Sequence, residues 1–388
     1  MKGRVITMGE TAQGAFVTAL ICDGRVEDIE VHPKGNANPM PAIGQVCYAT
    51  ITRILPNGRG AFCDLASGLG GFLRDSRDLR QGTRLPVQIA SLPEVGKALP
   101  VRRNPLIKGP RVILTPAAPG INASRKLTDP EEKDRLTNAV AKALRAWESK
   151  TPASAELGAI IRTSAEGVAA DRITAEVCTL LAAYRSIEMG EEQPRTTWFT
   201  KPGLLSSDIV VEWLSETPDA ILLDPSGASI AVAGLREHGP LNLWGDAVLA
   251  DRIETDPNPL DTASVLACLD ALQTPDVALA TGSMIVEPTR ALVAVDVNTG
   301  ADFSAAAGLK ANLSAARELP RQLRLRGLGG QIVVDFAPMP KKDRRTLEEA
   351  LRKAFRADPV ETSLVGWTTL GHYELQRRRE RRPLQEVL

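Results

Sequence analysis

The sequence predicts a multidomain fold of the α/β class with an all-β region near its start. The chain has 388 residues, of which 43% are hydrophobic, so it is long enough for several domains with real cores. Short apolar segments separated by glycine-rich turns fill its early part, and strand-like segments alternate with helix-like segments further on. Together these observations favour small β domains joined to mixed α/β domains.

The early part of the chain predicts a hairpin followed by a small barrel. Residues 3–30 read as short strands joined by glycine turns, and the Pro-, Gly- and Asn-rich segment 32–44 marks a boundary. From Gln45 a second set of short strands begins, which is typical of a small barrel. The residues alone favour the barrel core for the two aromatics of this block, Phe62 and Phe72.

The middle of the chain predicts two helices and then a further mixed region. A strong helix start lies at Thr128, and a second helix is expected over 164–188 after a strand at 158–163. A linker is expected at 194–203. Beyond it, strands and helices alternate to about Thr281.

The C-terminal part contains two aspartates that follow short apolar strands. Residues 291–295 lead to Asp296, and residues 331–334 lead to Asp335. If a helix crosses between neighbouring parallel strands, the two carboxylates lie side by side at the carboxyl ends. Close carboxylates repel unless a divalent cation lies between them, and Asn298 projects from the same side as Asp296. Aspartates also cap turns and helices, and the spacing alone favours that ordinary role.

The segment between the two aspartates predicts a helix with one irregularity. Apolar residues recur there at near-helical spacing, and the helix is expected to end at Gly327. Pro320 lies inside it, and an interior proline costs about 3 kcal/mol in an uninterrupted helix. We therefore expect a kink or a fresh helix start near Glu318. A further amphipathic helix is expected to begin near Pro340.

The phrases VAVDVNTG and ANLSAARELPRQLRLRGLGGQIVVDF, with the basic helix behind them, resemble the catalytic core of the ribonuclease E/G family. These are bacterial endoribonucleases that process and degrade RNA. The resemblance implies that Asp296 and Asp335 bind a catalytic Mg²⁺ ion and that Asn298 supports it. It extends more weakly over most of the chain, and the tail 371–388 is similar in outline to the family's last core helix.

The resemblance also implies a surface for RNA on the barrel. The phrases GAFCDL and GGFL are similar to the OB-fold RNA-binding insertion of the family. There, aromatics matching Phe62 and Phe72 face RNA, and a lysine matching Lys97 touches its backbone. Aromatic and basic side chains on a β surface suit single-stranded RNA, because bases stack while cations track the phosphates.

Three further positions of the resemblance concern the substrate's phosphates. Residues matching Arg162 and Thr163 recognise the 5′-monophosphate of RNA, and a residue matching Arg125 contacts substrate near the active site. An arginine fork and a hydroxyl suit phosphate oxygens, although an Arg-Thr pair is ordinarily plain surface. A substrate-contacting arginine of the family is not evident after the basic helix, where the chain reads PVETSLVG.

The resemblance implies a domain order for the whole chain. A ribonuclease H-like subdomain receives an OB-fold (S1-like) insertion and a 5′-sensor region, and a deoxyribonuclease I-like catalytic subdomain follows. The expected ranges are 1–40 and 201–280 for the two parts of the ribonuclease H-like subdomain, 41–110 for the OB-fold, 111–200 for the 5′-sensor region and 281–388 for the catalytic subdomain.

The charge pattern confines any contact with nucleic acid to local patches. Lys+Arg and Asp+Glu number 47 each, so the whole molecule has no net field to attract a polyanion. Because charge runs are usually solvated faces, only the two basic groups that flank the aspartates are expected to meet RNA. These groups are Arg321, Arg324 and Arg326, and Lys341, Lys342, Arg344 and Arg345.

The cysteines predict a reduced protein without a zinc site. The five cysteines show no CxxC pair and no metal-like spacing with the histidines. In the family a cysteine pair after the core shares zinc across a dimer, and we expect no zinc-linked dimer here, although other oligomers are open. No apolar run approaches membrane-spanning length, so no membrane contact and a cytoplasmic location are expected.

Taken together, residues and resemblance favour a magnesium-dependent endoribonuclease that cleaves single-stranded RNA during RNA processing or decay. The resemblance implies products with 5′-phosphate and 3′-hydroxyl ends. The competing hypothesis is a paralogue that binds RNA without cutting it. A weaker one is a metal-dependent phosphohydrolase on small substrates, which the basic patches and the OB-like block argue against.

Overall fold

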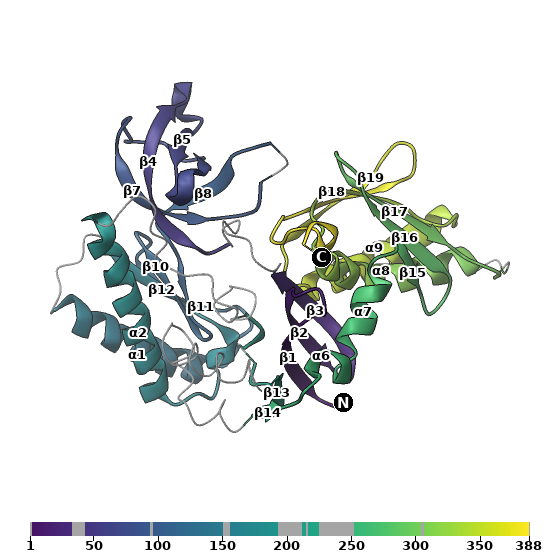
Figure 1. The fold of residues 1–388 in the computed structure, drawn as a ribbon, viewed down its shortest axis with the longest axis horizontal. Coiled ribbons are helices and arrows are strands. Elements are labelled where there is room, and N and C mark those ends of the chain that lie inside the picture. The colour runs from purple at the N-terminus through teal and green to yellow at the C-terminus, as the bar shows by residue number, and fades with distance from the viewer. Residues whose placement is uncertain are drawn as a thin grey trace. The chain divides into compact units, whose positions relative to one another are not determined.

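The computed structural model describes residues 2–32, 43–93, 96–149, 156–192, 212–214, 216–224, 252–302, 304 and 306–387. The chain splits into two compact units (Figure 1). The first unit comprises Met1–Gly3, Thr7–Lys34 and Asn258–Leu388, and the second comprises Arg4–Ile6 and Gly35–Pro257. Both combine helices with sheets, so the predicted mixed α/β class is confirmed.

The N-terminal strands confirm the predicted hairpin pattern. Strands β1 (Arg4–Glu10), β2 (Phe16–Cys22) and β3 (Arg25–His32) are neighbours in that order. β2 and β3 pair antiparallel, and Asp23 and Gly24 both adopt positive φ in the tight turn between them.

The main sheet of the first unit has six strands in the order β15-β16-β17-β18-β20-β19. Their bounds are β15 (Asp276–Ala278), β16 (Ser283–Pro288), β17 (Val293–Asn298), β18 (Gly330–Asp335), β19 (Thr362–Trp367) and β20 (Tyr373–Arg377). β17 and β18 are parallel, and helix α8 (Ala307–Leu325) connects them. The strand, helix and strand predicted around the two aspartates are therefore present.

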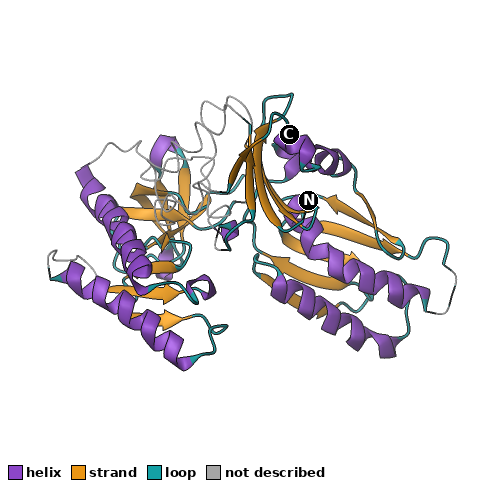
Figure 2. Cartoon of the chain, turned by 90° about the horizontal axis from the view of Figure 1, so that it is seen from below, coloured by secondary structure: helices purple, strands orange, loops and turns teal. Residues whose placement is uncertain are grey.

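Helices α8 and α9 (Arg344–Ala357) pack against one face of this sheet, as Figure 2 shows. Val293, Val295 and Val297 of β17 are buried in the core that the helices cover. Because side chains alternate along a strand, Asp296 and Asn298 project from the opposite, exposed face. The sheet thus has one apolar side and one side free for polar chemistry.

Helix α8 continues through Pro320, so the fresh start predicted near Glu318 is wrong. The proline removes one backbone donor, yet Leu319 and Leu323 on either side of it are almost completely buried. Packing of this apolar face offsets the local cost, because tertiary burial contributes more to a helix than propensity does. The helix ends as expected before Gly327, whose φ of 65° suits a residue without a side chain.

The tail of the chain is not the helix that the resemblance implied. Residues Tyr373–Arg377 form β20, which pairs antiparallel with both β18 and β19, and only a short 3-10 turn follows at Leu384–Glu386. Tyr373, Leu375 and Arg377 alternate as buried residues along β20. Arg377 is held there by an ion pair of 3.1 Å to Asp358. The burial of side chains along this segment alternates with a period of two, as in a strand. The segment is a strand and not a helix because it pairs with β18 on one side and β19 on the other.

The second unit contains the predicted barrel, which is closed. Its strands lie in the order β4-β5-β6-β8-β7, with bounds β4 (Val46–Ile54), β5 (Ala61–Asp64), β6 (Gly70–Leu73), β7 (Arg84–Ile89) and β8 (Leu99–Arg103). Its core is formed by small and aliphatic side chains such as Ala49, Ile51, Cys63 and Val87.

A four-stranded sheet follows the barrel, in the order β11-β12-β10-β9. Its elements are β9 (Ile107–Lys108), β10 (Val112–Pro116), β11 (Gly120–Ala123), β12 (Leu157–Ile161), α1 (Pro130–Glu148) and α2 (Ala170–Glu188), and both helices contact the sheet. Asp129 caps α1 by accepting a hydrogen bond from the Glu131 amide. α2 begins six residues later than predicted, because Gly167 turns the chain with a φ of 72°.

The remaining described elements are short. β13 (Ala220–Leu223) and β14 (Ile253–Thr255) pair in parallel in the second unit, and α6 (Pro259–Thr262) and α7 (Val265–Ala271) belong to the first. The predicted linker 194–203 and the elements predicted between 225 and 251 lie outside the described residues. No helix in the described part of the chain has the length and apolar character that crossing a membrane requires.

Candidate functional site

The two predicted aspartates are direct neighbours. Asp296 on β17 and Asp335 on β18 are register partners in the parallel pair, each near the carboxyl end of its strand. Both are exposed on the sheet face that α8 and α9 leave uncovered. The structure therefore brings together the two carboxylates that the sequence places 39 positions apart (335 − 296).

Asn298 belongs to the same cluster. Its side-chain amide donates a hydrogen bond of 2.8 Å to Oδ2 of Asp296. Gly282, at the start of β16, holds the strand end in place. A Cβ atom at Gly282 would lie 2.2 Å from the Asn298 carbonyl oxygen, so only glycine permits this approach. Asn298 thus orients one carboxylate while its own backbone is closely confined.

A histidine that the sequence did not single out completes the row. His372 lies one residue before β20, and its Nε2 atom is 3.9 Å from Oδ2 of Asp335. The last pair between β18 and β20 is Val334 with Tyr373, so His372 extends the row of Asp296 and Asp335 across neighbouring strands. The sequence offers one indication of this role, which is that His372 is a polar residue directly after Gly371 in the turn before β20.

An aromatic cluster adjoins this row. The rings of Phe336, Trp367 and Tyr373 lie within 5.2 to 6.2 Å of one another. The guanidinium of Arg344 lies 4.1 Å from the centre of the Trp367 ring and has no ion-pair partner among the described residues. The cluster therefore presents a cation close to the turn that carries His372.

The residues present fit a magnesium ion. Mg²⁺ prefers oxygen ligands and often needs only one or two carboxylates, because it keeps several waters. Asp296 and Asp335 supply two carboxylates from rigid strands, and Asn298 adds an amide. Within the described residues no group of three or more His, Cys, Asp and Glu side chains is arranged to hold a metal. A site made of two carboxylates with exposed oxygens remains suited to a partly hydrated ion.

Of the two basic groups expected to meet RNA, one is structural. Arg324 pairs with Asp358, Arg321 pairs with Glu318, and Arg326 is buried with 5% of its surface exposed. That expectation is wrong, because these arginines connect α8 to other parts of the first unit. Lys341, Lys342 and Arg345, in contrast, are exposed and follow Asp335 closely in the chain.

The barrel presents its aromatics outward. Phe62 on β5 and Phe72 on β6 are register partners whose ring centres lie 5.2 Å apart, and neither belongs to the barrel core. The ordinary expectation of core placement is therefore wrong for both. A Cβ atom at Gly60 would lie 2.6 Å from the Phe72 ring, so the glycine makes room for it.

Basic residues flank these rings. Arg53 is the register partner of Phe62, is exposed, and has no hydrogen-bond or ion-pair partner among the described residues. Lys97 is exposed just before β8, the strand that pairs with β6 beside Phe72. The sequence missed Arg53, whose outward placement follows a register shift in β4 between Ile51 and Arg53 that local alternation does not indicate. The outer face of the barrel thus carries cations and aromatics in the combination that suits single-stranded RNA.

The third group of predicted residues gathers at the ends of two parallel strands. Thr163 follows β12 and Arg125 follows β11, and the hydroxyls of Ser124 and Thr163 lie 2.9 Å apart. Arg162 donates a hydrogen bond of 3.1 Å to the Gly109 carbonyl and forms an ion pair with Glu212. Arg125 is exposed and has no such partner among the described residues. A phosphate at Arg162 would have to compete with the carboxylate of Glu212.

The barrel cysteines are buried thiols. Burial raises the pKa of Cys47 to about 11 and that of Cys63 to about 12. Thiols with such values stay protonated near neutral pH and are poor nucleophiles and poor metal ligands. All five cysteines are free thiols, but only these two are buried, since Cys178 is exposed and Cys22 and Cys268 are half-buried.

Comparison with known proteins gives consistent matches. A family model described as the ribonuclease E/G family matches residues 107–380. Ribonuclease G of Escherichia coli strain K12 is 25% identical over 406 residues, which cover 95% of this chain and 79% of that protein. Ribonuclease E of Nostoc sp. strain PCC 7120 is 26% identical over 399 residues, covering 96% of this chain and 55% of that protein. Ribonuclease E of Synechocystis sp. strain PCC 6803 is 28% identical over 373 residues, with 89% and 53% covered.

Proposed function

Because this chain belongs to the ribonuclease E/G family, we propose that it is an endoribonuclease that cleaves single-stranded RNA with the help of Mg²⁺. Relatives named ribonuclease G and ribonuclease E support a role in RNA processing or decay. The observation that carries the proposal is the register pairing of Asp296 with Asp335 on the open face of the sheet.

In this proposal Asp296 and Asp335 hold the metal ion. When bound there, Mg²⁺ supplies the activation of a water and offsets the negative charge that develops on the scissile phosphate. Asn298 keeps the Asp296 carboxylate in its orientation through the 2.8 Å hydrogen bond. In-line attack on phosphorus then leaves a 5′-phosphate on one product and a 3′-hydroxyl on the other.

His372 and the basic residues after Asp335 position the RNA backbone in the proposed reaction. His372 lies beside Asp335 and offers a ring N–H to a phosphate oxygen of the substrate. Lys341, Lys342 and Arg345 are exposed and provide positive charge near the same strand end. Their contribution is orientation, which lowers the entropy cost of reaching the reactive geometry.

The barrel and the β11–β12 edge contribute substrate binding. Phe62 and Phe72 stack on bases while Arg53 and Lys97 track phosphates, a division of work that needs no particular base sequence. Arg162 and Thr163 recognise a 5′-monophosphate, with Arg125 as a further phosphate contact. In the absence of RNA, Arg162 pairs with Glu212, and the 5′-phosphate of the substrate replaces Glu212 as the partner of the guanidinium.

The finer domain assignment follows the same resemblance. We assign the six-stranded sheet with α8 and α9 to the deoxyribonuclease I-like catalytic subdomain, from about 281 to 388. The closed barrel corresponds to the OB-fold range 41–110, and the four-stranded sheet with α1 and α2 corresponds to the 5′-sensor range 111–200. We likewise assign the described strands within residues 1–40 and 201–280 to the ribonuclease H-like subdomain.

A cleavage assay on a short single-stranded RNA tests the function. Purified protein is incubated with the RNA in Mg²⁺, in EDTA, and in EDTA followed by excess Mg²⁺, and product ends are mapped. Internal cleavage that requires Mg²⁺ and leaves 5′-phosphates is expected. Tight RNA binding with no cleavage in Mg²⁺ would favour the RNA-binding paralogue instead.

A further inference from the structure

A cavity of about 480 Å³ lies within the first unit, and its lining includes neither Asp296 nor Asp335. One face of α8 lines it with Ser314, Arg317 and Arg321, which recur at the spacing that puts residues on one side of a helix. The opposing wall comes from α7 and from residues 276–280, with Arg25 at the edge. Arginine is the side chain that recurs in this lining.

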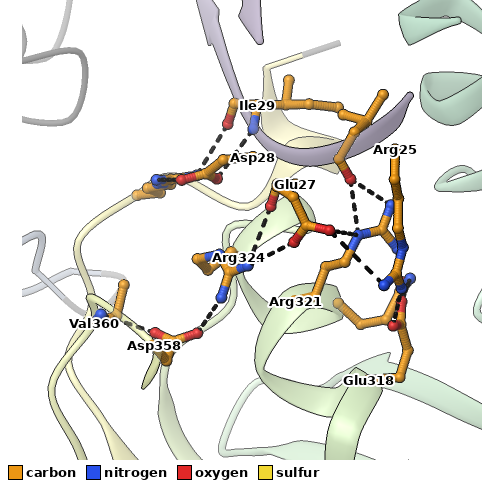
Figure 3. A network of polar contacts seen from close by, with 12 residues as sticks. Arg25, Glu27, Asp28, Ile29, Glu318, Arg321, Arg324, Asp358 and Val360 are labelled. Carbon is orange, nitrogen blue, oxygen red and sulfur yellow. Dashed lines mark hydrogen bonds and ion pairs between the residues drawn. The ribbon is translucent and has the colours of Figure 1, made fainter. Parts of the chain in front are cut away.

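Two of the lining arginines are already neutralised. Arg25 and Arg321 both pair with Glu318, and Arg321 also donates a hydrogen bond of 2.8 Å to the Val26 carbonyl (Figure 3). Glu27 lies close by and pairs with Arg25 at 3.8 Å, with Arg321 at 3.9 Å and with Arg324 at 3.4 Å. Among the residues that the structure describes, the carboxylates lining the cavity are Glu318 and Asp276. Four lining arginines against these two carboxylates and the neighbouring Glu27 leave one positive charge in excess.

Arg326 contributes a buried part of this excess. It is 5% exposed, and its hydrogen bonds go to neutral groups, which are the carbonyls of Leu272 and Thr274 and the side chain of Gln322. No carboxylate within the described residues lies at ion-pair distance from it. Burial lowers the pKa of Arg326, as expected for a desolvated cation. An anion in the cavity would supply the missing counter-charge.

Arg317 contributes a solvent-accessible positive charge to the cavity. It is exposed, it lines the cavity, and it makes no hydrogen bond or ion pair with any residue that the structure describes. Ser314, one turn earlier on α8, likewise leaves its hydroxyl without a partner in the described part of the chain. An arginine fork with a hydroxyl nearby matches the oxygens of a phosphate monoester.

The apolar part of the cavity lining suits the planar ring of a nucleobase. Ala271, Leu272, Leu279 and Ala280 make part of the cavity lining apolar. Ligand pockets of this size usually combine an apolar lining with a few polar groups that fix orientation. We propose that the cavity binds a nucleoside 5′-monophosphate, with the phosphate at Arg317 and Ser314, the positive charge of Arg326 adding to its attraction, and the base against the apolar part of the lining. This site is separate from the metal site and from Arg162.

Calorimetric titration of adenosine 5′-monophosphate into the full chain, in EDTA, tests the proposal. One saturable site with a dissociation constant below about 1 mM is expected. Arg317→Gln removes an exposed side chain that supports no other residue, so the fold should be retained. This variant should weaken binding about tenfold or more, because a charge-assisted phosphate contact is lost.

Matched controls identify the site. Arg356→Gln removes an exposed arginine of α9 that does not line the cavity, and Arg162→Ala removes the proposed 5′-phosphate contact of the second unit. Both should bind the nucleotide as the unaltered chain does. Adenosine, which lacks the phosphate, should bind at least tenfold more weakly, and inorganic phosphate should compete. Absent binding, equal binding of adenosine, or an unchanged affinity in Arg317→Gln would each overturn the proposal. Loss of binding in Arg162→Ala would assign the nucleotide to the other site instead.

Discussion

The Asn298 amide donates a 2.8 Å hydrogen bond to Oδ2 of Asp296, and both residues project from the same face of β17. A carboxylate held in this way is oriented before any ligand arrives, which stabilises the geometry that a metal ion needs. Asp335 on the neighbouring strand has no side-chain hydrogen bond of this kind within the described residues and is 64% exposed. The two carboxylates therefore differ in how firmly they are held.

We expect Asp296→Asn and Asp335→Asn each to abolish cleavage while RNA affinity falls little. A neutral amide holds Mg²⁺ less tightly than a carboxylate does. Asn298→Ala should raise the Mg²⁺ concentration for half-maximal cleavage by about 10- to 100-fold, since it removes only the orienting bond. Gln331→Ala, an exposed change earlier on β18, is the control. Undiminished cleavage by both aspartate variants would remove the proposed metal site.

His372→Ala should slow cleavage by about three- to tenfold, the effect of losing one neutral hydrogen bond to the substrate. His372→Gln keeps an N–H donor and should recover part of the rate. Single-turnover rates at saturating RNA measure the effect, because a role in positioning changes the rate of the step and leaves the folded state intact. Equal rates for the alanine and glutamine variants would argue against a donated hydrogen bond.

Phe62→Ala should weaken binding of a short single-stranded RNA by about 1–3 kcal/mol, the usual contribution of one stacked base. Fluorescence anisotropy measures the affinity, and cleavage at saturating RNA should stay nearly unchanged because Phe62 lies outside the metal site. Leu266→Ala, which truncates another exposed apolar side chain, serves as the control. If both variants bind RNA equally well, the outer face of the barrel has no part in binding.

The ion pair between Arg162 and Glu212 allows a test in both directions. Arg162→Ala should lower the rate on 5′-monophosphorylated RNA by about ten- to hundredfold, toward the rate on 5′-hydroxyl RNA. Glu212→Gln should instead increase the preference for the monophosphate, since the competing carboxylate is gone. Rates on matched RNAs that differ only at the 5′ end provide the measurement. Identical rates on all 5′ ends in the unaltered protein would make Arg162 a structural residue.

Glu318 predicts a specific dependence of stability on pH. Burial opposes its ionisation, but hydrogen bonds from Gln322 and Arg321 and the nearby charges outweigh burial and lower its pKa from 4.5. A carboxylate with a lowered pKa stabilises the fold above pH 4.5, and this stabilisation is lost as the pH falls further. Glu318→Gln should cost about 1–3 kcal/mol at neutral pH.

Chemical denaturation of Glu318→Gln and of the unaltered protein across pH measures this effect. The difference in free energy of unfolding should shrink as the pH drops below 4.5. Glu349→Gln, which breaks an exposed pair with Arg345, should cost less than about 1 kcal/mol at any pH. A constant difference between Glu318→Gln and the unaltered protein over the whole range would contradict the assigned pKa direction.

Local patterns in the sequence predicted the strands and helices, and the side chains that they expose, because these features depend on residues close together in the chain. The alternation in β17 and the apolar period of α8 were sufficient to bring Asp296 beside Asp335, because a strand, a crossover helix and a strand permit few arrangements. The outward placement of Phe62 was also readable in principle, since Ala61 and Cys63 on either side of it are buried. Composition alone had favoured the core.

Ion pairs, strand pairing and contacts between residues far apart in the sequence were not predictable in this way. Arg321, Arg324 and Arg326 read as a basic surface, and only the folded chain brings Glu27 and Asp358 to them from distant positions. The tail forms a strand because it pairs with β18 on one side and β19 on the other, and local sequence does not show that these partners are available. His372 follows a turn, and nothing in its local spacing indicates that Asp335 lies across the sheet.

The parallel pair of β17 and β18 has a consequence for how this enzyme can change over evolutionary time. Both proposed metal ligands come from one uninterrupted stretch, Val293 to Asp335, while the barrel rings and the Arg162 edge are encoded elsewhere in the chain. Mutations that retune which RNA is held can therefore accumulate in one part of the gene without disturbing the chemistry. A single-residue insertion inside β17 is different, since it would turn Asp296 and Asn298 to the covered face. The residues that select the RNA can therefore change independently, while the residues proposed to carry out the reaction are inherited together.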